Sequence, residues 1–148
     1  MTGLVVIVAA VVVALAFGLY RAASDGRFRG THQVRGAEAG PAEAEPTSIL
    51  TGTPYAAQLG ERATLLQFSS AFCAPCRATR RVLEDVARMV PGVAHVEVDA
   101  EHHLDLVRRV GILRTPTTLI LDAAGAEVSR AAGAPSKPAV IASLGFLA

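Results

Sequence analysis

Two cysteines, the only ones in the sequence, stand two residues apart in the run Cys73-Ala74-Pro75-Cys76. This spacing leaves the sulfurs close enough to close one small ring, so the pair can exchange between dithiol and disulfide. We expect a helix to open at the motif, because Pro75 lacks an N–H group and fits a first helical turn. The partial positive charge of a helix N-terminus stabilises a thiolate, and Arg77 adds to that charge. The pattern therefore predicts a redox-active dithiol whose reactivity Ala74, Pro75 and Arg77 tune.

Two other interpretations of the cysteine pair are a purely structural disulfide and half of a zinc site. A disulfide framework for a small secreted domain normally needs more than two cysteines. A zinc site needs two further ligands, for which His102 and His103 are the nearest candidates. Adjacent histidines point to different sides of a helix, and this pair matches no common Cys/His zinc spacing. We therefore expect redox exchange, with no metal and no organic cofactor.

The elements that must position the dithiol follow from the hydrophobic pattern. Residues 64–69 form a short, mostly apolar run that suits a buried strand ending just before the motif. Apolar residues then recur at helical spacing up to the stop signal Pro91-Gly92. The further expected elements are strands over 93–99, 117–121 and 127–131 and helices over 103–110 and 138–147. This order predicts an α/β fold with a mixed central sheet flanked by helices on both faces, in a domain spanning residues 48–148.

A charge-free apolar segment precedes this domain. Residues 4–20 would form a helix about 26 Å long, and with Met1 to Gly3 the segment reaches the length of a single membrane span. Tyr20 and Arg21 suit the interface at its end. We expect residues 1–21 to be a transmembrane anchor. A cleaved signal peptide is the alternative, since Ala14-Leu15-Ala16 offers a small-x-small site, but the leading Met-Thr-Gly lacks positive charge.

Residues 22–47 are rich in Gly, Ala, Glu, Pro and Arg and show no sustained apolar periodicity, which predicts a flexible linker. Four arginines, at positions 21, 27, 29 and 35, follow the apolar segment, and no basic residue precedes it. The positive-inside rule then places the domain in the cytoplasm, close to membrane lipid, with the exported side as the alternative. The net charge of +1 and the absence of Trp argue against nucleic-acid binding.

Two stretches of the sequence resemble the thioredoxin family. Residues 67–77, Gln-Phe-Ser-Ser-Ala-Phe-Cys-Ala-Pro-Cys-Arg, resemble its active-site segment, and residues 110–122, with the run Thr115-Pro116-Thr117, resemble its second signature. The resemblance covers essentially the whole expected domain and implies a thioredoxin-like fold. It also implies that Cys73 attacks, that Cys76 is the buried resolving thiol, and that Pro116 is cis and faces the dithiol. Phe72, Thr115 and Pro116 would contact the substrate, and Gly133 would lie near its groove.

Three residues depart from the family pattern. Phe72 stands where the family usually has Trp, and Ala74 stands where it often has Gly. Gln67 replaces a buried Asp that can take the proton of the resolving thiol, which an amide cannot do. His95 aligns with the lysine that commonly pairs with that Asp. His95 is therefore the candidate for proton transfer.

The function that these residues imply is that of a membrane-anchored thiol–disulfide oxidoreductase that reduces protein disulfides. Its partners would be protein disulfide substrates and either a thiol reductase or a membrane electron donor. The alternative is a binding module, in which the CxxC pair holds a soft metal such as Cu(I) or a partner without turning over disulfides.

Overall fold

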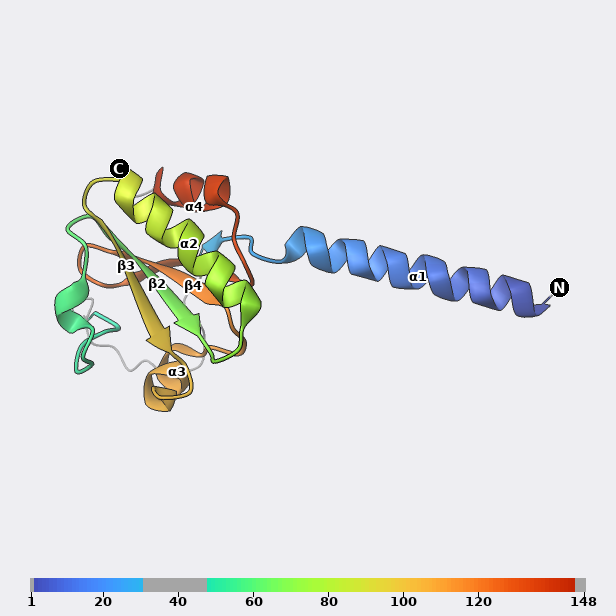
Figure 1. Cartoon of the computed structure of the whole chain (residues 1–148), viewed down its shortest axis with the longest axis horizontal. Helices are drawn as coiled ribbons and strands as arrows, with labels where there is room; N and C mark the ends of the chain where they lie inside the picture. The colour runs from blue at the N-terminus through green and yellow to red at the C-terminus, as the bar shows by residue number, and fades with distance from the viewer. Residues whose placement is uncertain (1, 31–47, 146–148) are drawn as a thin grey trace, which may run out of the picture.

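The structure is a computed structural model that describes residues 2–30 and 48–145, so most of the expected linker lies outside the described residues. The helices are α1 (Thr2–Ser24), α2 (Ala74–Met89), α3 (Leu104–Val110) and α4 (Lys137–Leu144), with a 3-10 turn, η1 (Ala56–Gln58). The strands are β1 (Arg29–Gly30), β2 (Ala63–Ser69), β3 (Val93–Asp99), β4 (Thr117–Asp122) and β5 (Glu127–Ala132). Figure 1 shows them as one sheet-and-helix domain with α1 leaving it.

The sheet is mixed, as the order of elements predicts. Its strand order is β1-β5-β4-β2-β3, in which β2 pairs with β3 in parallel and every other pair is antiparallel. The hydrophobic pattern predicts each of β2 to β5 to within one residue at either end. The expected α/β fold with a mixed central sheet is confirmed.

Alternation along β2 divides the core into two layers. Leu66 and Phe68 point into one buried cluster with α3, while Ala63 and Leu65 point into a second cluster with α2 and α4. Gln67 shares the second face and is fully buried under α2. The sheet is therefore covered by helices on both sides, and its α2 face carries the polar residues of the site.

Helix α1 is apolar on all sides, and none of its described residues is buried. It is the one helix among the described residues that is long and apolar enough to span a membrane, and it lies near the N-terminus, where signal sequences also lie. The anchor predicted from the sequence ends at Arg21, whereas the helix runs to Ser24.

The residues that follow α1 lie against the domain. The pattern places them in a flexible linker, but β1 pairs with β5, and Phe28 packs against the second core cluster. The docking rests on backbone pairing and on fit at single residues, neither of which produces hydrophobic periodicity. The sequence therefore carried little signal for it.

Candidate active site

The dithiol motif lies at the junction of β2 and α2. Cys73 is the N-cap of α2, and the backbone N–H of Cys76 donates to Cys73 Sγ at 3.1 Å. The two cysteines form a disulfide with their Cα atoms 5.2 Å apart, so the structure describes the oxidised form. Cys73 is half-buried, whereas Cys76 is 2% exposed. An N–H group at a helix N-terminus that points at Cys73 favours the thiolate of that residue after reduction.

Phe72, just before the motif, has a left-handed backbone with φ of 59°. Its side chain is 100% exposed, which is unusual for a large apolar residue. The left-handed backbone turns the ring away from the core and into solvent beside Cys73. A free apolar ring at this position offers a contact surface to an incoming chain.

A second loop adjoins the motif. The Thr115–Pro116 peptide bond is cis, as the resemblance implies. The hydroxyls of Ser70 and Thr115 lie 2.8 Å apart and join this loop to the loop before Cys73. The backbone N–H of Gly133 donates to the carbonyl of Pro116 at 2.8 Å. The residues that the resemblance assigns to substrate contact therefore belong to neighbouring loops at one end of the sheet.

The sequence model of the family described as Thioredoxin matches residues 46–145, which is most of the chain. The chain belongs to the thioredoxin family. The matched region contains the dithiol, the cis-proline loop and both core layers, and it excludes α1 and β1.

Individual relatives are distant. A thioredoxin H-type from Oryza sativa subsp. indica is 26% identical over 73 residues, which make up 49% of this chain and 59% of that protein. A mutant thioredoxin from Halobacterium salinarum NRC-1 has a TM-score of 0.56 at 20% identity, and the match covers 62% of this chain and 78% of that chain. Thioredoxin from Fasciola hepatica has a TM-score of 0.54 at 22% identity, covering 62% and 86%. These structures share the thioredoxin fold.

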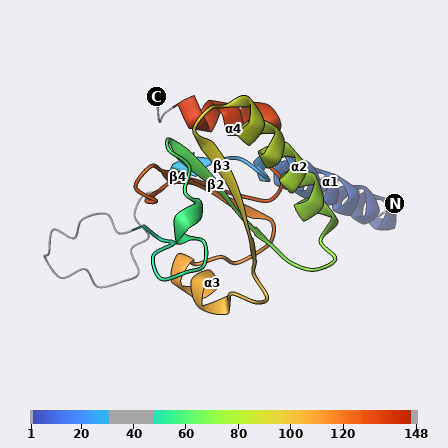
Figure 2. The same ribbon diagram turned by 60° about the vertical axis from the view of Figure 1, so that its left-hand side comes forward.

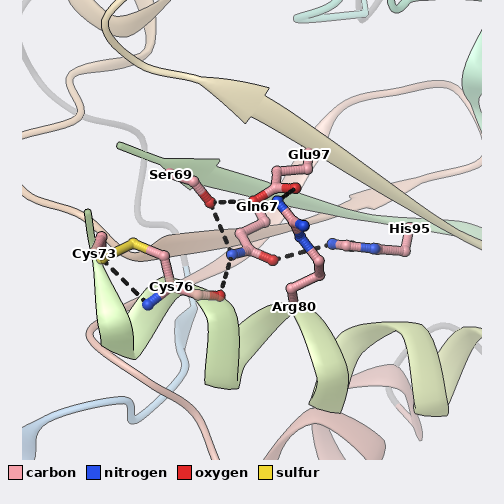
Figure 3. A network of polar contacts seen from close by, with 7 residues as sticks. All are labelled: Gln67, Ser69, Cys73, Cys76, Arg80, His95 and Glu97. Atoms are coloured by element: carbon pink, nitrogen blue, oxygen red, sulfur yellow. Dashed lines mark hydrogen bonds and ion pairs between the residues drawn. A yellow bond between two sulfur atoms is a disulfide. The ribbon is translucent and has the colours of Figure 1, made fainter. Parts of the chain in front are cut away.

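Gln67 organises a polar network beneath the thioredoxin dithiol (Figure 3). Its amide nitrogen donates to the carbonyl of Cys76 and to Ser69 Oγ, both at 2.9 Å. Its amide oxygen lies 3.1 Å from His95 Nε2. The register of the parallel strands explains this contact, because Gln67 pairs with Glu97 and His95 lies two residues earlier on the same face of β3.

His95 is thus adjacent to Gln67 but does not touch a sulfur among the described contacts. Burial is the main cause that lowers the pKa of His95, and Arg80 lowers it further, while Glu84 and Glu97 oppose the shift. A neutral imidazole is the form that can accept a proton. Proton transfer by His95 stays a prediction.

Glu97 is a carboxylate that the sequence analysis did not select. Its Oε1 accepts a hydrogen bond of 2.6 Å from Ser69, and its other oxygen forms an ion pair with Arg80. The alternation of β3 could have indicated Glu97, because this residue shares a face of the strand with His95. In the structure it lies opposite Gln67 in the register. What the sequence could not show is that Ser69 would bridge this carboxylate to the Gln67 amide.

A pocket of 420 Å³ opens beside the disulfide. It is lined by Tyr55, Ser69, Ser70, Ala71, Phe72, Cys73, Cys76, Arg77, Arg80, Glu97 and Asp99. Arginines and carboxylates both reach it, so the pocket is polar with mixed charge. The pocket extends from both cysteines to Glu97, the carboxylate of the Gln67 network.

The two adjacent histidines each contact a residue that lines this pocket. His102 Nδ1 contacts Asp99 Oδ2 at 2.7 Å, and His103 Nε2 lies 2.8 Å from the hydroxyl of Tyr55. Within residues 2–30 and 48–145, no group of three or more His, Cys, Asp or Glu side chains is arranged to hold a metal ion.

Proposed function

We propose that the chain is a membrane-anchored thiol–disulfide oxidoreductase that reduces protein disulfides. The observation that carries this proposal is the Cys73–Cys76 pair at the N-terminus of α2, beside a cis-proline loop in a thioredoxin domain. The chain spans 59% of the length of the curated relative that it matches, so its activity as a whole protein is inferred from the site.

The proposed cycle starts with the reduced pair. The Cys73 thiolate attacks one sulfur of the substrate disulfide, whose S–S bond breaks, and the second substrate sulfur leaves as a thiolate that takes up a proton. Cys76 then loses its proton and attacks Cys73 Sγ, which closes the Cys73–Cys76 disulfide and frees the first substrate sulfur. Two electrons pass to the substrate. A thiol reductase or a membrane electron donor must return the pair to the dithiol.

The proton of Cys76 needs an acceptor, because Gln67 replaces a carboxylate at the centre of the network. His95 is the acceptor that the sequence predicts, and Glu97 is a second candidate because it lines the pocket beside both cysteines. Phe72, Thr115 and Pro116 would hold the substrate chain against Cys73, while Ala74, Pro75 and Arg77 would tune the redox potential.

The test is insulin reduction with dithiothreitol as the terminal reductant, using detergent-solubilised full-length protein. We expect catalysis above the dithiothreitol background, and we expect Cys73→Ser to abolish it. Cys76→Ser should accumulate mixed disulfides, which Cys73→Ser cannot form. An inactive wild-type protein that instead binds one equivalent of Cu(I) would support the binding-module alternative.

A further inference from the structure

The chain passes from α1 to the sheet edge within two residues. Asp25 N donates to Arg21 O at 2.9 Å and extends the helical bonding, and Gly26 N donates to Ala132 O at 2.9 Å. Strand β1 then pairs with β5, with Arg29 opposite Arg130. Almost no free chain therefore separates the apolar helix from the domain.

The fit at this junction is specific. Gly26 has φ of +71°, and a Cβ on it would lie 2.2 Å from the carbonyl oxygen of Ala134. A Cβ on Gly133 would lie 2.7 Å from the Asp25 carboxylate. Asp25 also forms an ion pair with Arg114, whose Nη2 donates to the Ala132 carbonyl at 2.8 Å. The nearest atoms that a Cβ on Gly26 would meet belong to the backbone of Ala134 and Pro135. A side chain at Gly26 therefore cannot be accommodated in the docked position.

The junction lies at the dithiol end of the sheet. Ala132, which Gly26 contacts, pairs with Thr117 at the start of β4, directly after the cis-proline. Thr117 in turn pairs with Phe68, next to the end of β2 that leads to Cys73. Figures 1 and 2 agree that α1 leaves the domain on the side of the N-terminal end of α2.

Basic side chains surround the same junction. Arg27, Arg29, Arg114 and Arg130 line a pocket of 260 Å³ together with Ser24 and Ala132. Asp25 and Glu127 form ion pairs with Arg114 and Arg130, respectively. Basic residues that directly follow a membrane span are attracted to anionic headgroups. The charge of this edge therefore also favours an approach of the dithiol end to the membrane surface.

We propose that docking of residues 25–30 holds the dithiol end of the domain toward the membrane, so that the substrates are disulfides close to the bilayer surface in membrane proteins. If residues 22–47 formed a flexible random coil, the root-mean-square distance between its ends would be about 28 Å. Docking of residues 25–30 instead keeps the domain next to the end of α1. Two exposed apolar side chains are available to such a substrate: Phe72, beside Cys73 and 100% exposed, and Leu113, next to Arg114 of the junction and 97% exposed.

The first arm of the test measures orientation and needs no activity. Full-length protein carrying Cys73→Ser, Cys76→Ser and Leu113→Cys, with a fluorophore on the new thiol, is placed in vesicles containing headgroup spin-labelled lipid. We expect strong quenching. Gly26→Ala should lose most of it, because the residue cannot dock. Gly30→Ala is the matched control and should keep it, since a Cβ there meets no atom within 4 Å. Equal quenching in all three proteins, or none in any, overturns the orientation.

The second arm measures substrate class and rests on the proposed function. Vesicles contain the reduced protein and a single-span peptide whose disulfide loop begins either about five or about thirty Gly/Ser residues from the bilayer. We expect the near loop to be reduced about 10-fold faster, and we expect Gly26→Ala but not Gly30→Ala to remove that preference. Equal rates for both loops, with insulin still reduced, would refute the substrate class alone. If insulin is not reduced either, the proposed function fails, and the quenching arm still decides the orientation.

Discussion

The side-chain amide of Gln67 donates to the backbone carbonyl of Cys76 at 2.9 Å. A carbonyl can only accept, so the nitrogen of this amide must face Cys76, and its oxygen must face His95. His95 Nε2 therefore carries a proton and donates it to Gln67 Oε1. In neutral His95 the free lone pair lies on Nδ1, and a proton from Cys76 has to reach that atom.

We expect His95→Ala to slow the breakdown of the mixed disulfide more than its formation, by about 10- to 100-fold. This loss lies at or below the low end for a positioned general base, because water can take the place of the imidazole. Rapid-quench measurement of both steps checks this. His95→Gln separates the two possible roles, because it keeps a donor for Gln67 but does not titrate. Proton transfer requires His95→Gln to stay slow across pH 6 to 8, whereas full recovery would make His95 a residue that only positions Gln67.

Glu97→Gln should also slow resolution, by several-fold, because the Ser69–Glu97 bond ends in the pocket that both cysteines line. Arg80→Gln is the matched control, since it breaks the same ion pair and leaves the carboxylate. If the two variants slow resolution equally, then the ion pair matters and the carboxylate takes no proton. A double-mutant cycle with Ser69→Ala measures the coupling through the hydroxyl.

The lowered pKa of His95 makes folding stability depend on pH. The unfolded chain takes up this proton at pH 6.5, whereas the folded chain takes it up only at lower pH. Stability should therefore fall as the pH decreases through 6.5 and should level off below the folded pKa. Asp85 and Asp99 have lowered pKa values, so they titrate well below pH 5.5 in both the folded and the unfolded chain and do not contribute to this change. Urea midpoints at pH 7.5 and 5.5 should show a drop that is smaller in His95→Gln, and an unchanged drop would contradict this assignment.

Phe72→Ala should raise KM for protein substrates several-fold and leave the free energy of unfolding within about 1 kcal/mol of wild type. The ring is fully exposed, so its removal leaves no cavity. Phe72→Tyr is the control, because it keeps an aromatic ring of similar size at the same backbone. A KM unchanged by Phe72→Ala, measured with insulin and with a folded protein disulfide, would show that substrates do not touch this ring.

The arginines that follow the apolar segment predict that the dithiol domain faces the cytoplasm. A reporter that is active only outside the cytoplasm, fused after Ala148, should be silent, and a reporter active inside should work. Replacing the arginines at positions 21, 27 and 29 with glutamine tests the cause and should weaken the bias. Strong activity of the outside reporter in the wild-type fusion would place the domain on the exported side.

Much of the fold could be predicted because its signals are local. The buried apolar run of β2 and the alternation of β3 each indicate a strand, and Pro91-Gly92 indicates the end of a helix. The contact of His95 with Gln67 could be predicted, because the family residues that align with these two commonly pair with each other. The Ser69–Glu97 bond and the pocket beside it depend on the register between two strands. Strand β1 is still harder to predict, since two exposed residues become a strand only through the partner that they meet.

Strand β1 also protects the sheet. With β1 in place, the outer backbone groups of β5 beside Arg130 and Ser129 are covered, whereas an uncovered edge strand invites pairing with another molecule. The family match begins at residue 46, so a soluble fragment cut at that boundary would lose this cover together with the apolar helix. A fragment beginning at Asp25 retains it. We expect the shorter fragment to aggregate at concentrations where the longer one stays monomeric, which makes Asp25 the better start for recombinant production.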